Sequence, residues 1–241
     1  MTVQGKRARG GAHTLALLVL FALAGAFAGS AAAEDVGRLV GRVIDAYGGH
    51  ARLAAVARLH ATGTTSSVRT GTDGPSERWF ARPDKLRDLR YSPTHTESRI
   101  LNGAQSWKDG APVNEPFRAA MVLQAARFGL PLILAERPVS DRGAVTESGK
   151  AMRVLAVDLG GGLSLEVTID PGSARIARSR GVVGFGGQTM EFATAYGDFR
   201  TVDGVLFAHR EEHFAMGMRT GATMLSRIEV NPRLATDVFR P

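Results

Sequence analysis

The chain has 241 residues, a formal net charge of +7 and no cysteine, which excludes disulfides and thiol chemistry. Its basic residues are interleaved with acidic ones and form no block of five or more, so we predict no nucleic-acid-binding surface. A mildly basic surface remains compatible with transient contact with anionic lipid head groups.

The first 33 residues have the pattern of a secretory signal peptide. Three basic residues open the segment: Lys6, Arg7 and Arg9. An apolar run over residues 15–27 follows, and small residues at 31–33 end it. This run is shorter than the roughly 20 residues that span a bilayer, which favours a cleaved signal over a transmembrane helix. We therefore predict an exported, soluble mature chain over residues 34–241. It forms a single domain without a lipid anchor, since no cysteine stands at the cleavage point.

A helix is predicted at the start of the mature chain. Six apolar residues recur at spacings of three and four, and therefore share one face: Val36, Leu39, Val40, Val43, Ile44 and Tyr47. Asp35 can cap this helix, and Gly48-Gly49 can end it in the left-handed conformation. A second short amphipathic stretch covers residues 51–59, before polar and β-branched residues take over at Thr62-Gly63-Thr64.

The rest of the chain is predicted to be mostly short antiparallel strands that pair in sequence order. Turn signals separate them at Asp73-Gly74-Pro75, Asn102-Gly103, Asp109-Gly110, Gly160-Gly161-Gly162, Asp170-Pro171-Gly172 and Asp203-Gly204. Residues 163–170 alternate between apolar and polar types, as in a strand with one solvated face. Residues 79–81 and 89–91 indicate two more strands around a break at Pro83.

One segment, residues 117–136, has the composition of a helix instead, and Pro131 is expected to kink or split it. The predicted order is thus a helix, about five strands, an apolar helical insertion and about six more strands, an α+β chain. The glycine-rich segment 181–187 matches neither a dinucleotide-binding nor a phosphate-loop spacing. We interpret it as a flexible hairpin or bulge, and we predict no cofactor.

The string from His209 to His213 matches H-x-x-E-H, the pattern of inverted zinc proteases. Two such histidines hold one ion when a helix brings them together, but the surrounding sequence is typical of a strand. On a strand the two rings lie roughly 13 Å apart, because each residue advances about 3.3 Å. A zinc hydrolase at His209, Glu212 and His213 is therefore a remote alternative, and we predict neither a metal nor catalysis.

Apolar side chains indicate a ligand cavity. Methionine suits sites that accept variable apolar shapes, and pockets with few polar groups are typical of carriers. For any single methionine, ordinary core packing is the alternative interpretation. Residue type and strand parity select eight candidate lining residues: Trp79, Tyr91, Met121, Phe128, Phe192, Phe214, Met216 and Met224.

Several stretches carry a resemblance to a known family: Ala46-Tyr47-Gly48-Gly49, Thr62-Gly63-Thr64, the run over 196–207, and the ending 228–232 with Phe239 and Pro241. Through them the mature chain resembles the LolA-like and LolB-like superfamily, the outer-membrane lipoprotein-sorting proteins of bacterial envelopes. The resemblance implies a curved, incomplete antiparallel β-barrel of about 11 strands. Its open side is covered by α-helices, and an apolar cavity lies between helices and sheet.

The resemblance also implies a periplasmic location and a function. Our first hypothesis is a soluble, non-catalytic carrier of lipid or lipoprotein acyl chains, with envelope membrane proteins as partners. Each buried methylene stabilises such a complex by roughly 0.8 kcal/mol, so a shuttle needs a dry concave surface. The second hypothesis is a periplasmic sensor or protein-interaction domain on the same scaffold, of the envelope-stress regulator type. No arginine here is matched to the basic residue that gates ligand entry in the carriers.

Overall fold

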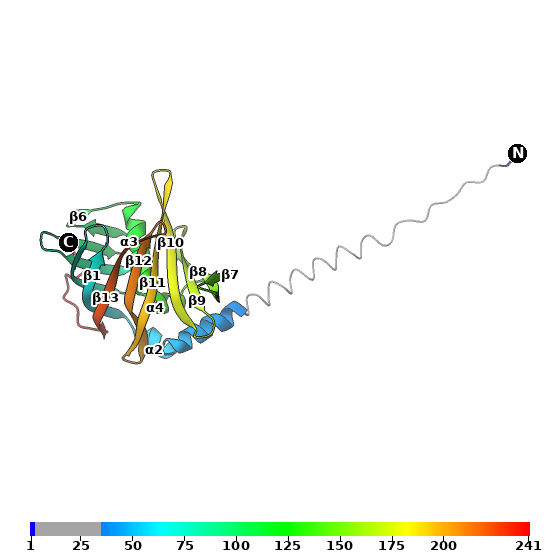
Figure 1. The fold of residues 1–241 in the computed structure, drawn as a ribbon, viewed down its shortest axis with the longest axis horizontal. Helices are drawn as coiled ribbons and strands as arrows, with labels where there is room; N and C mark the ends of the chain where they lie inside the picture. Colours follow the sequence, from blue (N-terminus) through cyan, green and yellow to red (C-terminus); the bar gives the residue numbers. More distant parts are fainter. Residues whose placement is uncertain (3–34) are drawn as a thin grey trace.

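Figure 1 shows the computed structural model, whose described residues are 1–2 and 35–241. Apart from its first two residues, the predicted signal peptide lies outside the described residues, and so does its cleavage site. Within residues 35–241, none of the helices combines the length and the hydrophobicity that a membrane span requires.

Two β-meanders meet in one antiparallel sheet of 13 strands. The first contains β1 (Arg58–Ser67), β2 (Thr72–Ala81), β3 (Lys85–Tyr91), β4 (Thr96–Asn102), β5 (Gln105–Lys108) and β6 (Ala111–Pro112). The second contains β7 (Val139–Glu147), β8 (Lys150–Gly160), β9 (Leu163–Asp170), β10 (Arg175–Phe185), β11 (Gln188–Val202), β12 (Val205–Ala215) and β13 (Met218–Val230). Neighbours in sequence are neighbours in the sheet, and the meanders join where β1 pairs with β13. Strands β6 and β7 are the edges, so the sheet stays open.

The expected open, curved antiparallel sheet is confirmed, but the expected number of about 11 strands is wrong. The sheet has 13, six before the helical insertion and seven after it. Two strands lack the alternation that marks a half-buried strand. Strand β6 has two residues, and β7 leaves nearly all of its side chains exposed.

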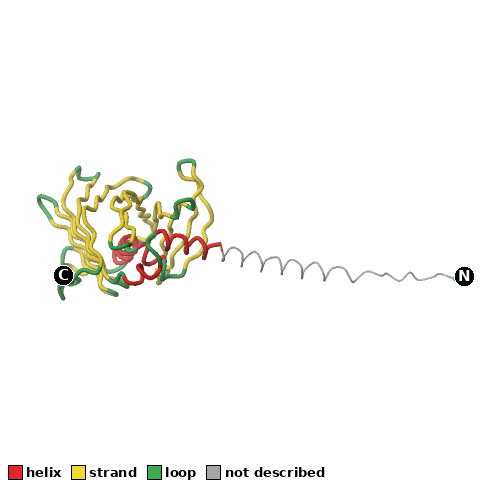
Figure 2. Tube along the Cα trace, turned by 90° about the horizontal axis from the view of Figure 1, so that it is seen from below, coloured by secondary structure: helices red, strands yellow, loops and turns green. Residues whose placement is uncertain are grey.

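The helices lie within the curve of the sheet, as Figure 2 shows in red against yellow strands. They are a helix over residues 35–46 (here the N-terminal helix), α2 (His50–Ala55), α3 (Phe117–Phe128) and α4 (Leu130–Leu134). Because α3 and α4 connect β6 to β7, the insertion joins the two edges of the sheet. Helix α3 contacts strands of both meanders, including β4 and β10.

Both predicted helical regions are confirmed. Leu39, Val43 and Tyr47 of the predicted apolar stripe are buried in the main core, and the glycines at 48 and 49 have φ angles of 121° and 87°. The second stretch is shorter than expected, because α2 ends at Ala55 and the chain enters β1 three residues later. The apolar insertion is split at Gly129 into α3 and α4, and Pro131 lies in the first turn of α4.

Two glycine-containing segments differ from the sequence prediction. The predicted turn at 73–75 lies inside β2, and the chain turns earlier, at Gly71. Gly74 is required by close packing of strands, since a Cβ there would lie 1.8 Å from the Tyr91 carbonyl oxygen. Most of the glycine-rich segment 181–187 belongs to β10, and only residues 186–187 form a turn.

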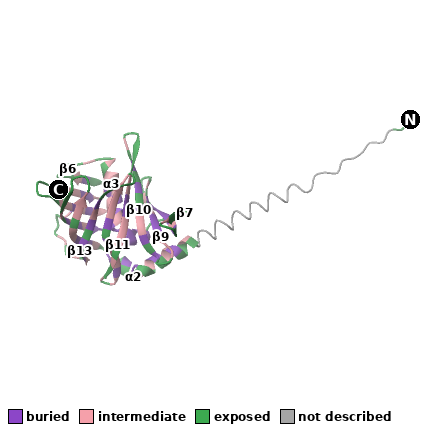
Figure 3. Ribbon diagram, in the orientation of Figure 1, coloured by how far each residue is buried: buried purple, intermediate pink, exposed green. Residues whose placement is uncertain are grey.

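The two faces of the first meander carry separate cores. Phe80 and Leu101 point toward the helices and belong to the main cluster. Their sequence neighbours Ala81 and Ile100 lie on the opposite face, where Phe239 of the C-terminal tail covers them. Figure 3 shows exposed residues at the hairpin tips and also along the N-terminal helix.

Candidate ligand cavity

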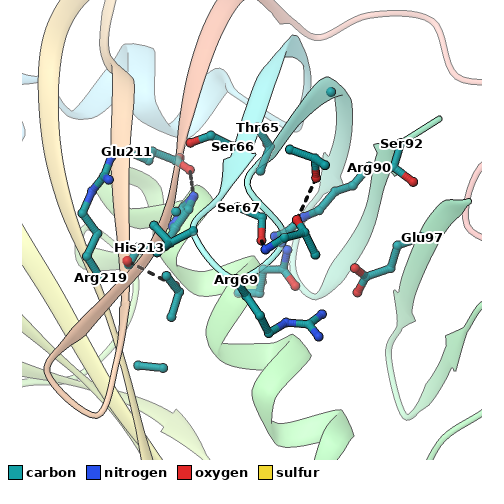
Figure 4. A pocket seen from close by; sticks show the side chains of 18 of the residues that line it. Thr65, Ser66, Ser67, Arg69, Arg90, Ser92, Glu97, Glu211, His213 and Arg219 are labelled. Carbon is teal, nitrogen blue, oxygen red and sulfur yellow. Dashed lines mark hydrogen bonds and ion pairs between the residues drawn. The ribbon is translucent and has the colours of Figure 1, made fainter. Parts of the chain in front are cut away.

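A cavity of about 800 Å³ lies between α3 and the strands around the seam of the two meanders. Strands β1 to β4 and β11 to β13 contribute to its walls. Figure 4 shows side chains from several of these elements around the hollow, with Glu211 and His213 from β12, Arg90 from β3 and Glu97 from β4. The cavity thus lies on the side of the sheet that carries the helices.

A buried ion-pair network forms the floor of this cavity. The Arg78 guanidinium donates through Nη1 to Glu211 Oε2 at 2.5 Å and through Nε to Asp88 Oδ1 at 2.9 Å. Its Nη2 donates to Thr223 Oγ1 at 3.1 Å, and Arg90 Nε donates to the second Asp88 oxygen at 2.9 Å. The contact from β2 to β12 passes across β1 and β13, so it depends on the curvature of the sheet.

The four ionisable members of the network, Arg78, Asp88, Arg90 and Glu211, are all charged. The side chains of Arg78, Asp88 and Glu211 are 5%, 1% and 7% exposed. Burial by itself raises the pKa of the Asp88 carboxyl, but Arg90 and Arg78 outweigh it and hold that pKa well below its usual range. Burial likewise raises the pKa of the Glu211 carboxyl, but Arg78 and His213 together outweigh it, and the net shift of that pKa is downward. The paired carboxylates in turn keep the pKa of Arg78 above its ordinary value against the effect of burial.

His213 differs from its charged neighbours because it is held neutral. Burial lowers the pKa of its imidazole to about 4, even though Glu211 lies 3.8 Å from Nε2 and favours the protonated form. The cations Arg78, Arg90 and Arg127 add to the lowering. Nε2 lies 2.9 Å from Thr223 Oγ1, a hydrogen bond that a neutral ring forms in either role.

The lining is more polar than the apolar hollow that the resemblance implies. It contains two glutamates, Glu97 and Glu211. It contains six arginines: Arg69, Arg78, Arg90, Arg99, Arg127 and Arg219. Four aromatic residues line the same cavity, so its surface combines cations with apolar walls.

Four of the eight predicted lining residues border the cavity: Tyr91, Phe128, Phe192 and Phe214. Phe128 packs edge-on against Phe80 with ring centroids 6.3 Å apart, which fixes it at the end of α3. The Phe214 ring also packs with Arg178, whose guanidinium carbon lies 5.0 Å from its centroid. Contact of these four residues with a ligand stays a prediction.

The other four lie elsewhere. Trp79 stacks on His60 with ring centroids 3.6 Å apart, on the face opposite Arg78, and Met121 is buried in the main core. Met224 is 46% exposed, since Thr223 and Leu225 on either side of it point inward. Met216 is 55% exposed at the turn between β12 and β13.

The H-x-x-E-H string lies in β12, which confirms the predicted strand. His209 Nδ1 lies 2.8 Å from the Leu225 carbonyl oxygen, inside the sheet. Glu212 pairs instead with Arg210, its neighbour on the outer face. The strand therefore does not present His209, Glu212 and His213 to one ion. In the described part of the chain, no three His, Cys, Asp or Glu side chains are arranged to hold a metal.

The candidate lining residues were chosen for their apolar type, so the charged network was not predicted. One signal in the sequence did indicate it. Leu86, Asp88 and Arg90 alternate along β3 and therefore share a face. Leu86 is buried at 1% exposure, so the same parity places Asp88 and Arg90 inside the sheet. Charged residues in register with a buried leucine thus indicated a polar interior.

No protein-family model matches this chain, and no curated protein matches its sequence. Solved structures do share its fold. A LolA superfamily protein from Nitrosomonas europaea aligns over 77% of this chain and 90% of its own, with 8% identity and a TM-score of 0.52. A DUF1329 family protein from Desulfovibrio piger aligns over 85% and 97%, with 8% identity and a TM-score of 0.50. The resemblance is thereby confirmed at the level of architecture: this chain has the fold of the LolA superfamily.

Proposed function

We propose that the mature chain is a periplasmic, non-catalytic carrier that takes up an acyl chain of a lipid or lipoprotein. The observation that carries the proposal is the cavity of about 800 Å³ beside α3, in a sheet of the LolA type. Its size falls in the range of roughly 300–1,000 Å³ that small-molecule sites occupy. The signal-peptide pattern of residues 1–33 supports export, and export supplies the periplasmic setting.

The aromatic part of the lining supports an apolar ligand. Tyr91, Phe128 and Phe192 come from β3, α3 and β11, so a chain passing between them is in contact on several sides. Each methylene that leaves water in this space contributes roughly 0.8 kcal/mol. A short acyl segment is thus sufficient for reversible binding.

The test is recovery of lipid with the protein. The full chain is expressed in a Gram-negative host, the mature protein is taken from the envelope, and bound lipid is identified by native mass spectrometry. Ser67→Trp fills the cavity from β1, whereas Thr64→Trp adds the same ring on an exposed position of the same strand outside the lining. We expect Ser67→Trp to weaken uptake of a fluorescent fatty acid about tenfold, a loss of 1.4 kcal/mol, and Thr64→Trp to leave it unchanged. Protein that carries no lipid and takes up no fatty acid contradicts the proposal.

A different observation favours the sensor or protein-interaction alternative. Met216 and Met218 are 55% and 71% exposed at the β12–β13 hairpin, and Met190 is 37% exposed near the tip of β10–β11. Exposed apolar side chains in one region are typical of a protein contact. Because the chain lacks cysteine, Met218→Cys gives a single crosslinking site. A stable crosslinked protein together with an empty cavity would favour this alternative over the carrier.

A further inference from the structure

On the inner wall of the cavity, one guanidinium has no counter-ion among the described residues. Arg127, in the last turn of α3, lines the cavity, and its guanidinium carbon lies 5.9 Å from the centre of the Phe192 ring. Among residues 35–241, its guanidinium forms neither an ion pair nor a hydrogen bond. The other arginines of the inner wall are paired: Arg78 with Glu211 and Asp88, Arg90 with Asp88, and Arg99 with Glu97.

The charges around Arg127 leave this part of the cavity one anion short. Arg78, Arg90 and Arg127 bring three positive charges to the floor, and Asp88 and Glu211 bring two negative ones. His213 adds no positive charge near neutral pH, since burial lowers its pKa to about 4. Arg69 and Arg219 are exposed to solvent, where water hydrates them, so the uncompensated charge that matters is the inner one.

The surroundings disfavour an isolated cation at this place. Burial lowers the pKa of the Arg127 guanidinium, interactions with Tyr196 and Glu211 partly oppose this, and the charges of Arg78 and Arg90 add to it. Arg127 is half-buried, so its charge is only partly hydrated and is stabilised by a partner of opposite charge. A bound anion that contacts Arg127 would be such a partner.

A second donor lies on the same side of α3. Gln124 precedes Arg127 by three residues, so the two share a helix face, and both line the cavity. The Gln124 carbonyl accepts from Arg99 Nη1 at 3.3 Å, which directs its amide nitrogen away from that arginine. The amide nitrogen of Gln124 is buried and has no hydrogen-bond partner in the part of the chain that the structure describes. It lies near the Asp88 carboxyl and contributes to the lowering of that pKa.

We propose that the cavity recognises an amphiphile with an anionic head group, a carboxylate or a phosphate ester, whose oxygens bind the Arg127 guanidinium with Gln124 beside it. Guanidinium matches the planar geometry of both groups and forms the stronger, charge-assisted hydrogen bonds. The aromatic rings of Phe128 and Phe192 border the same space and take the adjoining part of the chain. This inference rests on the proposed carrier function and adds the chemical class of its ligand.

The experiment compares three ligands of equal chain length: dodecanoate, dodecyl phosphate and dodecanol. Mature protein from the full chain is freed of lipid, and each ligand is titrated by calorimetry at neutral pH. We expect the anions to bind at least about tenfold more tightly than dodecanol. Arg127→Gln should weaken binding of the anions about tenfold or more and leave dodecanol unchanged, while Arg127→Lys should retain part of the preference. Arg200→Gln, which removes an arginine paired with Asp198 outside the cavity, is the matched control and should behave as wild type.

The outcomes separate the two proposals. If the wild-type protein binds dodecanol as tightly as both anions, the head-group inference fails and the carrier function stands, whatever the variants do. If it binds none of the three ligands, the carrier function fails and the inference fails with it. Preference for only one of the two anions supports the inference and identifies the head group. The comparison of dodecanol with the two anions uses the wild-type protein alone. A wild-type protein without a preference for the anions therefore contradicts the inference even if an Arg127 variant folds poorly.

Discussion

The concave side of this sheet contains two regions that are built in opposite ways. One region is a filled apolar core, to which the N-terminal helix, α4, β8 and β9 contribute side chains such as Leu39, Leu132, Leu155 and Ile169. Around the seam of β1 and β13, the same side of the sheet carries arginines and carboxylates and stays hollow. Apolar interiors close up to crystal-like density, whereas charged side chains hold water and resist closure. The difference indicates that the polar lining keeps the cavity open.

The largest expected effect lies in the network beneath the hollow region. Arg78→Gln removes the cation shared by Glu211 and Asp88 and leaves Glu211 without its buried partner. Breaking a buried pair in this way costs about 3–5 kcal/mol of unfolding free energy. Urea denaturation at neutral pH measures the loss, and Arg200→Gln, at an exposed pair, serves as the control. A midpoint unchanged by Arg78→Gln would show that the network is already hydrated and not structural.

The filled region is tested by removing a fully buried side chain. Leu132→Ala, in α4, should lower the free energy of unfolding by about 3 kcal/mol. The loss has two parts, the transfer free energy of the removed atoms and the cost of the cavity that they leave. Phe192→Ala removes a larger side chain from a wall that already borders the hollow, so we expect a smaller loss. The same denaturation series measures both variants. Equal losses would mean that the cavity wall is packed as tightly as the core, and the contrast between the regions would disappear.

Local patterns were sufficient to predict the helices. The apolar stripe that includes Leu39 and Val43 has the helical period, and two glycines end it because they adopt positive φ without strain. The prediction of a turn at 73–75 failed for a physical reason as well. The same residue types serve turns and close strand contacts, and Gly74 serves the contact with Tyr91. Sequence alone does not distinguish the two uses.

The cavity was less predictable, because its chemistry depends on contacts between distant strands. The parity of β3 places Asp88 and Arg90 inside, but their partners come from elsewhere: Arg78 from β2, and Glu211 from β12 across the seam. The pairing of β1 with β13 joins the first and last strands of the sheet region, and no local pattern specifies it. Choosing lining residues by apolar type therefore located the aromatic walls and missed the charges.

A smaller effect is expected from pH. The pKa of His213 is about 4 in the folded protein, below the ordinary 6.5, so the unfolded chain takes up the proton first as the pH falls. The stability that neutral His213 contributes is complete above pH 6.5. It is lost progressively toward pH 4, by about 2–3 kcal/mol in total. Unfolding free energies of wild type and His213→Gln, measured between pH 8 and 4, should therefore converge at the acid end. Parallel profiles would show that the imidazole is solvated and that this part of the cavity is wetter than its burial indicates.

The smallest expected effect concerns the position of α3, which contributes residues to both regions. A Cβ at Gly181 of β10 would lie 2.5 and 2.7 Å from the methyl carbons of Leu123, a fully buried residue of α3 with little room to move. Gly184, on the same strand, has no atom within 4 Å of such a Cβ and gives the matched control. We expect Gly181→Ala to destabilise the protein by about 1–3 kcal/mol through overpacking, and Gly184→Ala to have little effect.

Gly181→Ala also connects packing to ligand preference. Leu123 and Arg127 are four residues apart and lie on one side of α3, so displacing the helix at Leu123 moves the guanidinium as well. The variant should therefore bind dodecanoate less tightly while dodecanol binding changes little, as measured by the same calorimetric titration. If stability falls but the preference for the anion is kept, Arg127 reaches its ligand by side-chain adjustment. The packing of Leu123 in the filled region would then not determine the position of the Arg127 guanidinium in the hollow region.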